Sequence, residues 1–134
     1  MTRFLKMFVI LVLGGLLVVA CGDSGTEPED NNNNTVNGDF TVTVGSGTTP
    51  QYSWNAGNAF SVSVVRTATP TTIVWGIATP GQGNIASPAT HGATPGGAVP
   101  TAIGTVETTL TSGVEYRVSV TLLDGKTGWT EFTP

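Results

Sequence analysis

The side chains of this chain that could do chemistry are few: one cysteine, Cys21, one histidine, His91, and nine acids. His91 lies in residues 79–100, a stretch with four prolines and five glycines. A histidine needs partner ligands to hold a metal ion, and no acidic cluster lies near His91 in the sequence. We therefore expect His91 to be a solvated loop residue without a catalytic or metal-binding role.

No arrangement typical of an active site is visible elsewhere. None of the serines lies in a G-x-S-x-G elbow, and Gly-Gln-Gly at residues 81–83 lacks the further glycine and the lysine of a phosphate-binding loop. Nothing in the spacing of the later acids pairs two of them across a cleft. These acids are Asp39, Glu107, Glu115, Asp124 and Glu131. The sequence predicts a protein that is not an enzyme and that carries no cofactor and no metal.

The lone cysteine follows a segment with the layout of a secretory signal peptide. Arg3 and Lys6 give a basic start, and residues 7–20 are apolar. This run is shorter than the roughly 20 residues that a membrane-spanning helix needs. It ends in Leu-Val-Val-Ala-Cys at residues 17–21, which resembles the lipobox of bacterial lipoproteins.

The resemblance implies that residues 1–20 are removed and that Cys21 is acylated and becomes the first residue of the mature chain. Acyl chains on Cys21 would anchor the protein, because each buried methylene contributes about 0.8 kcal/mol. Gly22 follows the cysteine, and the first aspartate comes only at Asp23. In Gram-negative lipoproteins an aspartate directly after the cysteine is typical of retention in the inner membrane. We therefore expect a bacterial envelope protein, lipid-anchored in the outer membrane.

The mature chain is acidic and has a polar beginning. Removing residues 1–20 lowers the formal net charge from −4 to −6, which excludes the basic surface of a nucleic-acid-binding protein. Residues 21–34 contain no large apolar side chain after Cys21, so we expect a disordered tether. Asp30, Asn32 and Asn34 have the spacing of a calcium loop, but the loop's glycine and glutamate are missing. A flexible spacer is the better interpretation.

Residues 35–134 predict one all-β domain. Apolar residues alternate with polar ones in several short runs separated by turn residues, which is typical of strands. The runs centre on residues 40–44, 52–54, 60–64, 73–77, 103–107, 114–122 and 129–133. Residues 79–100 should be an irregular loop or edge segment, and Asp124-Gly125 predicts a hairpin turn.

About seven short strands indicate a single antiparallel β-sandwich. With Cys21 acylated no thiol remains for a disulfide, so the apolar core alone must stabilise the fold. The predicted core is Phe40, Val42, Trp54, Phe60, Val62, Ile73, Trp75, Leu110, Tyr116, Val118, Val120 and Phe132.

A more specific signal is Leu110-Thr-Ser-Gly113-Val-Glu-Tyr116. It resembles the corner between the fifth and sixth strands of fibronectin type III and related immunoglobulin-like domains. Gly113 can take the positive φ of a tight turn, and the Tyr116 hydroxyl can bond back to the backbone near that turn. Trp54 resembles the core tryptophan of the same family. Ser112 stands where the family usually has proline, and the 79–100 segment is long, so an unrelated sandwich or small barrel stays an alternative.

Strand parity suggests one surface for a partner. If Phe132 points inward, Trp129 points outward beside Glu131. There it could contact a ligand, although a cap on the end of the sandwich is the favoured interpretation. We expect a non-catalytic module for protein binding, adhesion or structure, with envelope or surface proteins as partners. A carbohydrate-binding module for cell-wall glycans is the alternative function.

Overall fold

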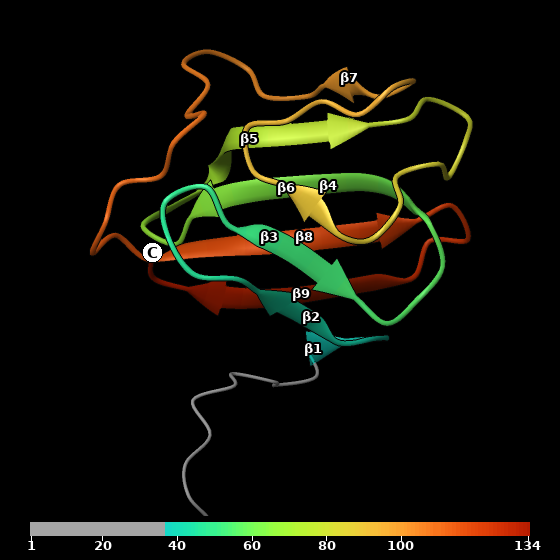
Figure 1. The fold of residues 1–134 in the computed structure, drawn as a ribbon, viewed down its shortest axis with the longest axis horizontal. Helices are drawn as coiled ribbons and strands as arrows, with labels where there is room; N and C mark the ends of the chain where they lie inside the picture. The colour runs from blue at the N-terminus through green and yellow to red at the C-terminus, as the bar shows by residue number, and fades with distance from the viewer. Residues whose placement is uncertain (1–36) are drawn as a thin grey trace, which may run out of the picture. The chain divides into compact units, whose positions relative to one another are not determined.

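Two antiparallel sheets face each other in the computed structural model, which describes residues 37–134 (Figure 1). The larger sheet has the strand order β1-β9-β8-β4-β5-β7, and the smaller sheet has the order β2-β3-β6. The strands are β1 Asn37–Gly38, β2 Val42–Val44, β3 Gln51–Trp54, β4 Ala59–Arg66, β5 Thr69–Ala78, β6 Ala89–Thr90, β7 Val99–Pro100, β8 Tyr116–Leu122 and β9 Thr127–Phe132. The predicted all-β sandwich is confirmed.

The core lies between the sheets and follows from the alternation of the long strands. Val62 and Val64 of β4 pair with Val120 and Val118 of β8, and all four side chains are fully buried. Burying a valine contributes about 1.5–3 kcal/mol relative to leaving it exposed. Of the residues predicted for the core, all are buried except for the half-buried Phe60, Ile73 and Phe132. Within residues 37–134, eight further hydrophobic side chains are buried that the predicted core did not include: Tyr52, Ala59, Val64, Val74, Ile77, Ala78, Ile85 and Ala89.

The turns of the large sheet agree with the sequence. Asp124 and Gly125 lie in the hairpin between β8 and β9, where Gly125 has a φ of 87° and the Lys126 N–H donates to Asp124 Oδ1 over 3.1 Å. A φ in this range favours glycine. The hairpin fixes the register that places Trp129 opposite Ser119 and Glu131 opposite Arg117.

One predicted strand is wrong. Residues 103–107 form no strand, and Ile103 is 88% exposed. If the strands of the sandwich are counted from β2, the fifth strand is β6, which pairs with β3. Residues 79–100 contain β6 and β7, and β7 lies along the edge of β5 (Figure 1). Residues 103–107 form no continuous ladder with β5: the backbone bends at Gly104, whose φ is 95°, and the Glu107 N–H then donates to the Val74 carbonyl over 2.8 Å.

The predicted signal peptide (1–20), the acylated Cys21, the tether (21–34) and the calcium-loop alternative at Asp30 lie outside the described residues. Those interpretations stay predictions from the sequence.

Gly128 is expected to tolerate no side chain. It is buried on the inner face of β9, and a Cβ there would lie 2.6 Å from a Phe40 ring carbon and 2.7 Å from the Phe40 carbonyl oxygen. Overpacking of this kind costs about 1–3 kcal/mol, so Gly128→Ala should lower the free energy of unfolding by about that amount in urea titrations. In the control Gly57→Ala, the new methyl group meets nothing within 4 Å. If both variants unfold at the same urea concentration, Phe40 does not pack against Gly128 as described.

Candidate functional site

The outer face of β8 and β9 carries the residues with the clearest binding chemistry. Along β9, Gly128 and Thr130 are buried toward the core, whereas Trp129 and Glu131 face outward and are half-buried. Arg117 lies opposite Glu131 on β8. Strand alternation therefore gathers an indole, a guanidinium and a carboxylate on one face.

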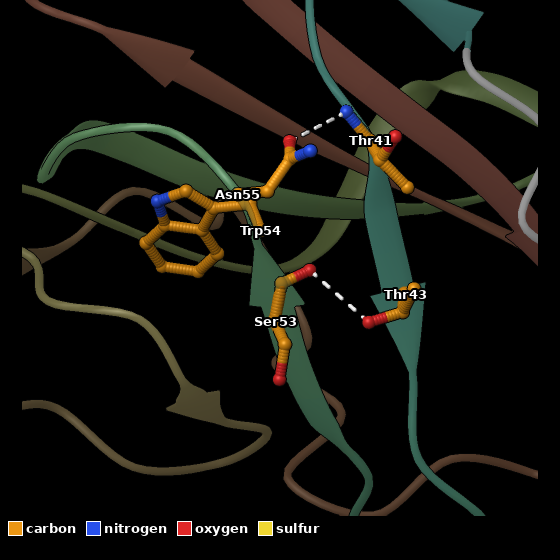
Figure 2. A pocket seen from close by; sticks show the side chains of 5 residues that line it. All are labelled: Thr41, Thr43, Ser53, Trp54 and Asn55. Carbon is orange, nitrogen blue, oxygen red and sulfur yellow. Dashed lines mark hydrogen bonds between the residues drawn. The ribbon is translucent and has the colours of Figure 1, made fainter.

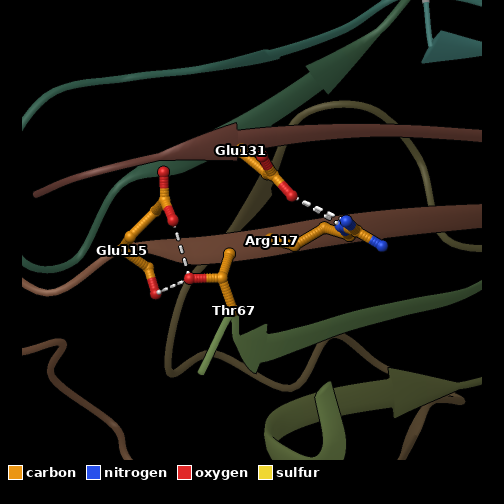
Figure 3. Close-up of polar contacts among 4 residues, drawn as sticks. All are labelled: Thr67, Glu115, Arg117 and Glu131. Carbon is orange, nitrogen blue, oxygen red and sulfur yellow. Dashed lines mark hydrogen bonds and ion pairs between the residues drawn. The ribbon is translucent and has the colours of Figure 1, made fainter. Parts of the chain in front are cut away.

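Arg117 is held over the indole of Trp129. Its Nη2 and Nε lie 2.6 Å and 3.1 Å from Glu131 Oε1 (Figure 3), and its Cζ lies 4.3 Å from the centroid of the Trp129 ring. Both ionic side chains are about 40% exposed, so the ion pair contributes at most about 1 kcal/mol. The cation–π contact contributes about 0.5–1 kcal/mol. Together these contacts keep one face of the indole covered. We call Arg117, Trp129 and Glu131 the indole cluster.

A second polar contact on this side of the molecule is structural. The Thr67 hydroxyl donates to Glu115 Oε2 over 2.8 Å (Figure 3), and the Thr67 N–H donates to the Glu115 carbonyl over 3.1 Å. These bonds fasten the turn between β4 and β5 to the residue that precedes β8. The carboxylate and the carbonyl of Glu115 thus both accept hydrogen bonds from Thr67.

A shallow hollow of about 330 Å³ lies on the small sheet and is lined by Thr41, Thr43, Ser53, Trp54 and Asn55. Figure 2 shows that its polar groups bond within the sheet: the Thr41 N–H donates to Asn55 Oδ1 over 3.0 Å, and the Thr43 hydroxyl donates to the Ser53 carbonyl over 3.5 Å. The lining contains neither an acid nor a base. The hollow therefore offers hydroxyl and amide groups for weak polar contacts, but no group for proton transfer.

His91 is not a solvated loop residue, and that prediction is wrong. Its side chain is 3% exposed and packs against Trp75, with 4.9 Å between the ring centroids. Nε2 lies 2.8 Å from the Glu107 carbonyl oxygen, and Nδ1 lies 2.8 Å from the hydroxyl of Tyr52. A carbonyl oxygen only accepts, so Nε2 carries the proton, and the Tyr52 hydroxyl donates to Nδ1. Both ring nitrogens are thus used inside the domain.

At the predicted corner, the Tyr116 hydroxyl is hydrogen-bonded to both Thr111 and Glu107. Gly113 has a φ of 78°, and Leu110 is buried. The Tyr116 hydroxyl accepts from the Thr111 N–H over 3.1 Å and donates to Glu107 Oε2 over 3.0 Å. Glu107 thereby joins the turn before β8 to the site of His91. These contacts of Glu107 could not be predicted from the sequence, because Tyr116 and His91 lie 9 and 16 residues away in the chain.

Within residues 37–134 there is no group of three histidine, cysteine or acidic side chains that could hold a metal ion. The same part of the chain contains no helix long and apolar enough to span a membrane. Comparison of the chain with protein-family models, with curated proteins and with solved structures gave no match.

Proposed function

We propose that this protein is a bacterial envelope lipoprotein, anchored through Cys21 in the outer membrane, that binds another protein without catalysing a reaction. The sequence up to Cys21 supports the anchor: a basic start, a short apolar run and a small residue directly before the only cysteine. A tether of 13 residues would hold the domain within roughly 20 Å of the lipid surface. Envelope or surface proteins are within reach at that distance.

The strand order supports a fibronectin type III-like module. The first, second and fifth strands of the sandwich, β2, β3 and β6, form the small sheet, and β4, β5, β8 and β9 form the centre of the large one. In the constant-type immunoglobulin arrangement the fourth strand joins the first, second and fifth. Here the fourth strand, β5, pairs with the third, β4. The Tyr116 hydroxyl bond at the corner supports the same family.

The observation that carries the choice of a protein partner is the position of Arg117 over Trp129. A sugar ring that stacked on this face of the indole would have to displace the guanidinium and break its bonds to Glu131. A protein can instead use the indole cluster as it stands, because Trp and Arg are enriched at interface hot spots. The carbohydrate-binding alternative is therefore the weaker one.

Trp129→Ala is expected to weaken partner binding by about thirtyfold, because truncating a central interface tryptophan costs about 2 kcal/mol. A photo-crosslinking amino acid at Ser119, directly opposite Trp129, should give one defined product in intact cells. That product should disappear in the Trp129→Ala background. The control Thr43→Ala, on an exposed position of the small sheet, should leave it unchanged.

Two outcomes would contradict the proposal. Crosslinking at Ser119 that is insensitive to Trp129→Ala would show that the indole cluster is not the contact surface. Quenching of tryptophan fluorescence by soluble cell-wall oligosaccharides, lost in Trp129→Phe, would favour the carbohydrate-binding alternative. This readout is selective because Trp54 and Trp75 are buried and only 7% and 3% exposed.

A further inference from the structure

The outer edge of β5 is covered by an irregular segment, residues 92–109, which we call the strap. Its β7 residues Val99 and Pro100 pair with Ala78 and Ile77 of β5. Further along, the Thr101 N–H donates to the Gly76 carbonyl over 2.9 Å, and the Glu107 N–H donates to the Val74 carbonyl over 2.8 Å. An uncovered edge strand would offer these backbone groups to another strand. The strap therefore closes the edge of the large sheet.

Three side chains outside the strap hold it at Glu107, near its end. The Glu107 carboxylate contacts Arg66 of β4 over 2.7 Å and accepts from the Tyr116 hydroxyl of β8 over 3.0 Å. The Glu107 carbonyl accepts from His91 Nε2, and His91 directly precedes the strap. His91 thus joins the beginning of the strap to its end. By contrast, Ile103 in the middle of the strap is 88% exposed.

The surroundings of His91 suit only its neutral form. An imidazolium donates from both nitrogens, so the Tyr52 hydroxyl of β3 would have to turn from donor to acceptor. Tyr52 is fully buried, and no acceptor other than His91 Nδ1 is found for its proton in the described part of the chain. On the β5 side the ring meets Trp75, which is uncharged. Hydration of the charged ring would require it to leave this site.

Burial and the neighbouring charged groups shift the pKa of His91 in opposite directions. Burial lowers the pKa of His91 below its ordinary value, while the Glu107 carbonyl and carboxylate raise it by a smaller amount. Arg66 partly neutralises that carboxylate. Burial also raises the pKa of Tyr52, and repulsion from Tyr116 adds to this effect, so Tyr52 stays a neutral donor. Burial therefore has the larger effect on the pKa of His91, which is lowered.

We propose that His91 is an acid-sensitive latch whose protonation draws the ring out of its site and releases the strap from the edge of β5. When the strap is released, the His91 imidazole takes up a proton near the ordinary histidine pKa of about 6.5. When the strap is in place, His91 takes up a proton only at lower pH. The latch is therefore closed above about pH 6.5. Opening increases as the pH falls below that value, until His91 is protonated in its buried site as well. The opened edge of β5 could then pair with an added strand.

Amide hydrogen exchange of the full chain in detergent tests the latch. After correction for the intrinsic effect of pH, exchange at the Thr101 and Glu107 amides should be faster at about pH 5 than at about pH 7.5, because protonation of the released imidazole favours opening. Amides in the middle of β8 should not change. His91→Gln places an uncharged donor near the position of Nε2, so its corrected exchange at Thr101 and Glu107 should be independent of pH.

Equal pH dependence in the wild-type protein and in His91→Gln would overturn the proposal. If the variant does not fold, NMR titration of the wild-type imidazole replaces it: the Thr101 and Glu107 amide shifts should then follow the same midpoint as His91. Different midpoints, or a His91 that stays neutral while the strap amides shift, would also overturn it. The indole cluster plays no part in this test, so its outcome is separate from that of the proposed function.

Discussion

Cys21→Ser is expected to move the protein from the membrane fraction into the aqueous phase. In the proposed mature protein, the acyl chains on Cys21 are the whole anchor. Each buried methylene contributes about 0.8 kcal/mol, and two or more chains make binding nearly irreversible, whereas one chain binds only marginally. Partitioning in a detergent that separates into two phases should show near-complete transfer. Intact mass spectrometry should show the loss of the lipid mass.

A matched control is available three residues further along the chain. Ser24→Ala leaves Leu-Val-Val-Ala-Cys at residues 17–21 intact and should stay in the detergent phase with its lipid. A Cys21→Ser protein that remains in the membrane fraction and keeps residues 1–20 would show instead that the apolar run 7–20 is itself the anchor. An unmodified thiol in the wild-type protein would contradict acylation directly.

The long strands could be predicted because their environment is the same over many residues. β4 and β8 lie in the middle of the large sheet, so one face of each is buried along its central part and the sequence alternates there. The hairpin between β8 and β9 could be predicted for a local reason, namely the turn preference of Asp124-Gly125. Both features depend on residues that are close together in the chain.

The surroundings of His91 could not be predicted in this way. Tyr52 is 39 residues away and Glu107 is 16 residues away, and the local sequence is rich in glycine and proline, which is typical of a solvated loop. β6 has only two residues, too few to show alternation. Residues 103–107 do alternate, but the backbone bends at Gly104, where φ is 95°, and this interrupts an extended strand. The environment of His91 is thus set by residues distant in the chain, which local sequence patterns do not show.

The proposed site was only partly visible in the sequence. Parity placed Trp129 and Glu131 on the outer face, and the structure has them there. Parity also places Arg117 on the outer face of β8, where the sequence alone predicts a solvated side chain. What the sequence could not show is the register of β8 against β9, which brings the guanidinium onto the indole. That contact is a further reason to prefer a protein ligand over a sugar at this surface.

Tyr116→Ala is expected to lower the free energy of unfolding by about 3–5 kcal/mol, the usual cost of removing a buried aromatic ring. Tyr116 is fully buried, and its ring stacks on Phe132 with 6.0 Å between the centroids. For a domain of this size each kcal/mol lowers the melting temperature by about 4–8 °C. Thermal and urea unfolding both measure the loss. Thr121→Ala, at an outward position of the same strand, is the control and should change the free energy by no more than about 0.5 kcal/mol.

Tyr116→Phe distinguishes the contribution of the hydroxyl to stability from that of the ring. It keeps the packing and removes the bonds to the Thr111 N–H and to Glu107 Oε2, so we expect a cost of about 1–3 kcal/mol, since one of the two bonds goes to a charged group. A loss as small as that of Thr121→Ala would show that the corner is stabilised by the ring alone. Because Glu107 also holds the strap, Tyr116→Phe should in addition speed hydrogen exchange at the Glu107 amide more than at the amides of β8. Equal acceleration at both places would mean that the hydroxyl stabilises the whole sandwich and not the strap in particular.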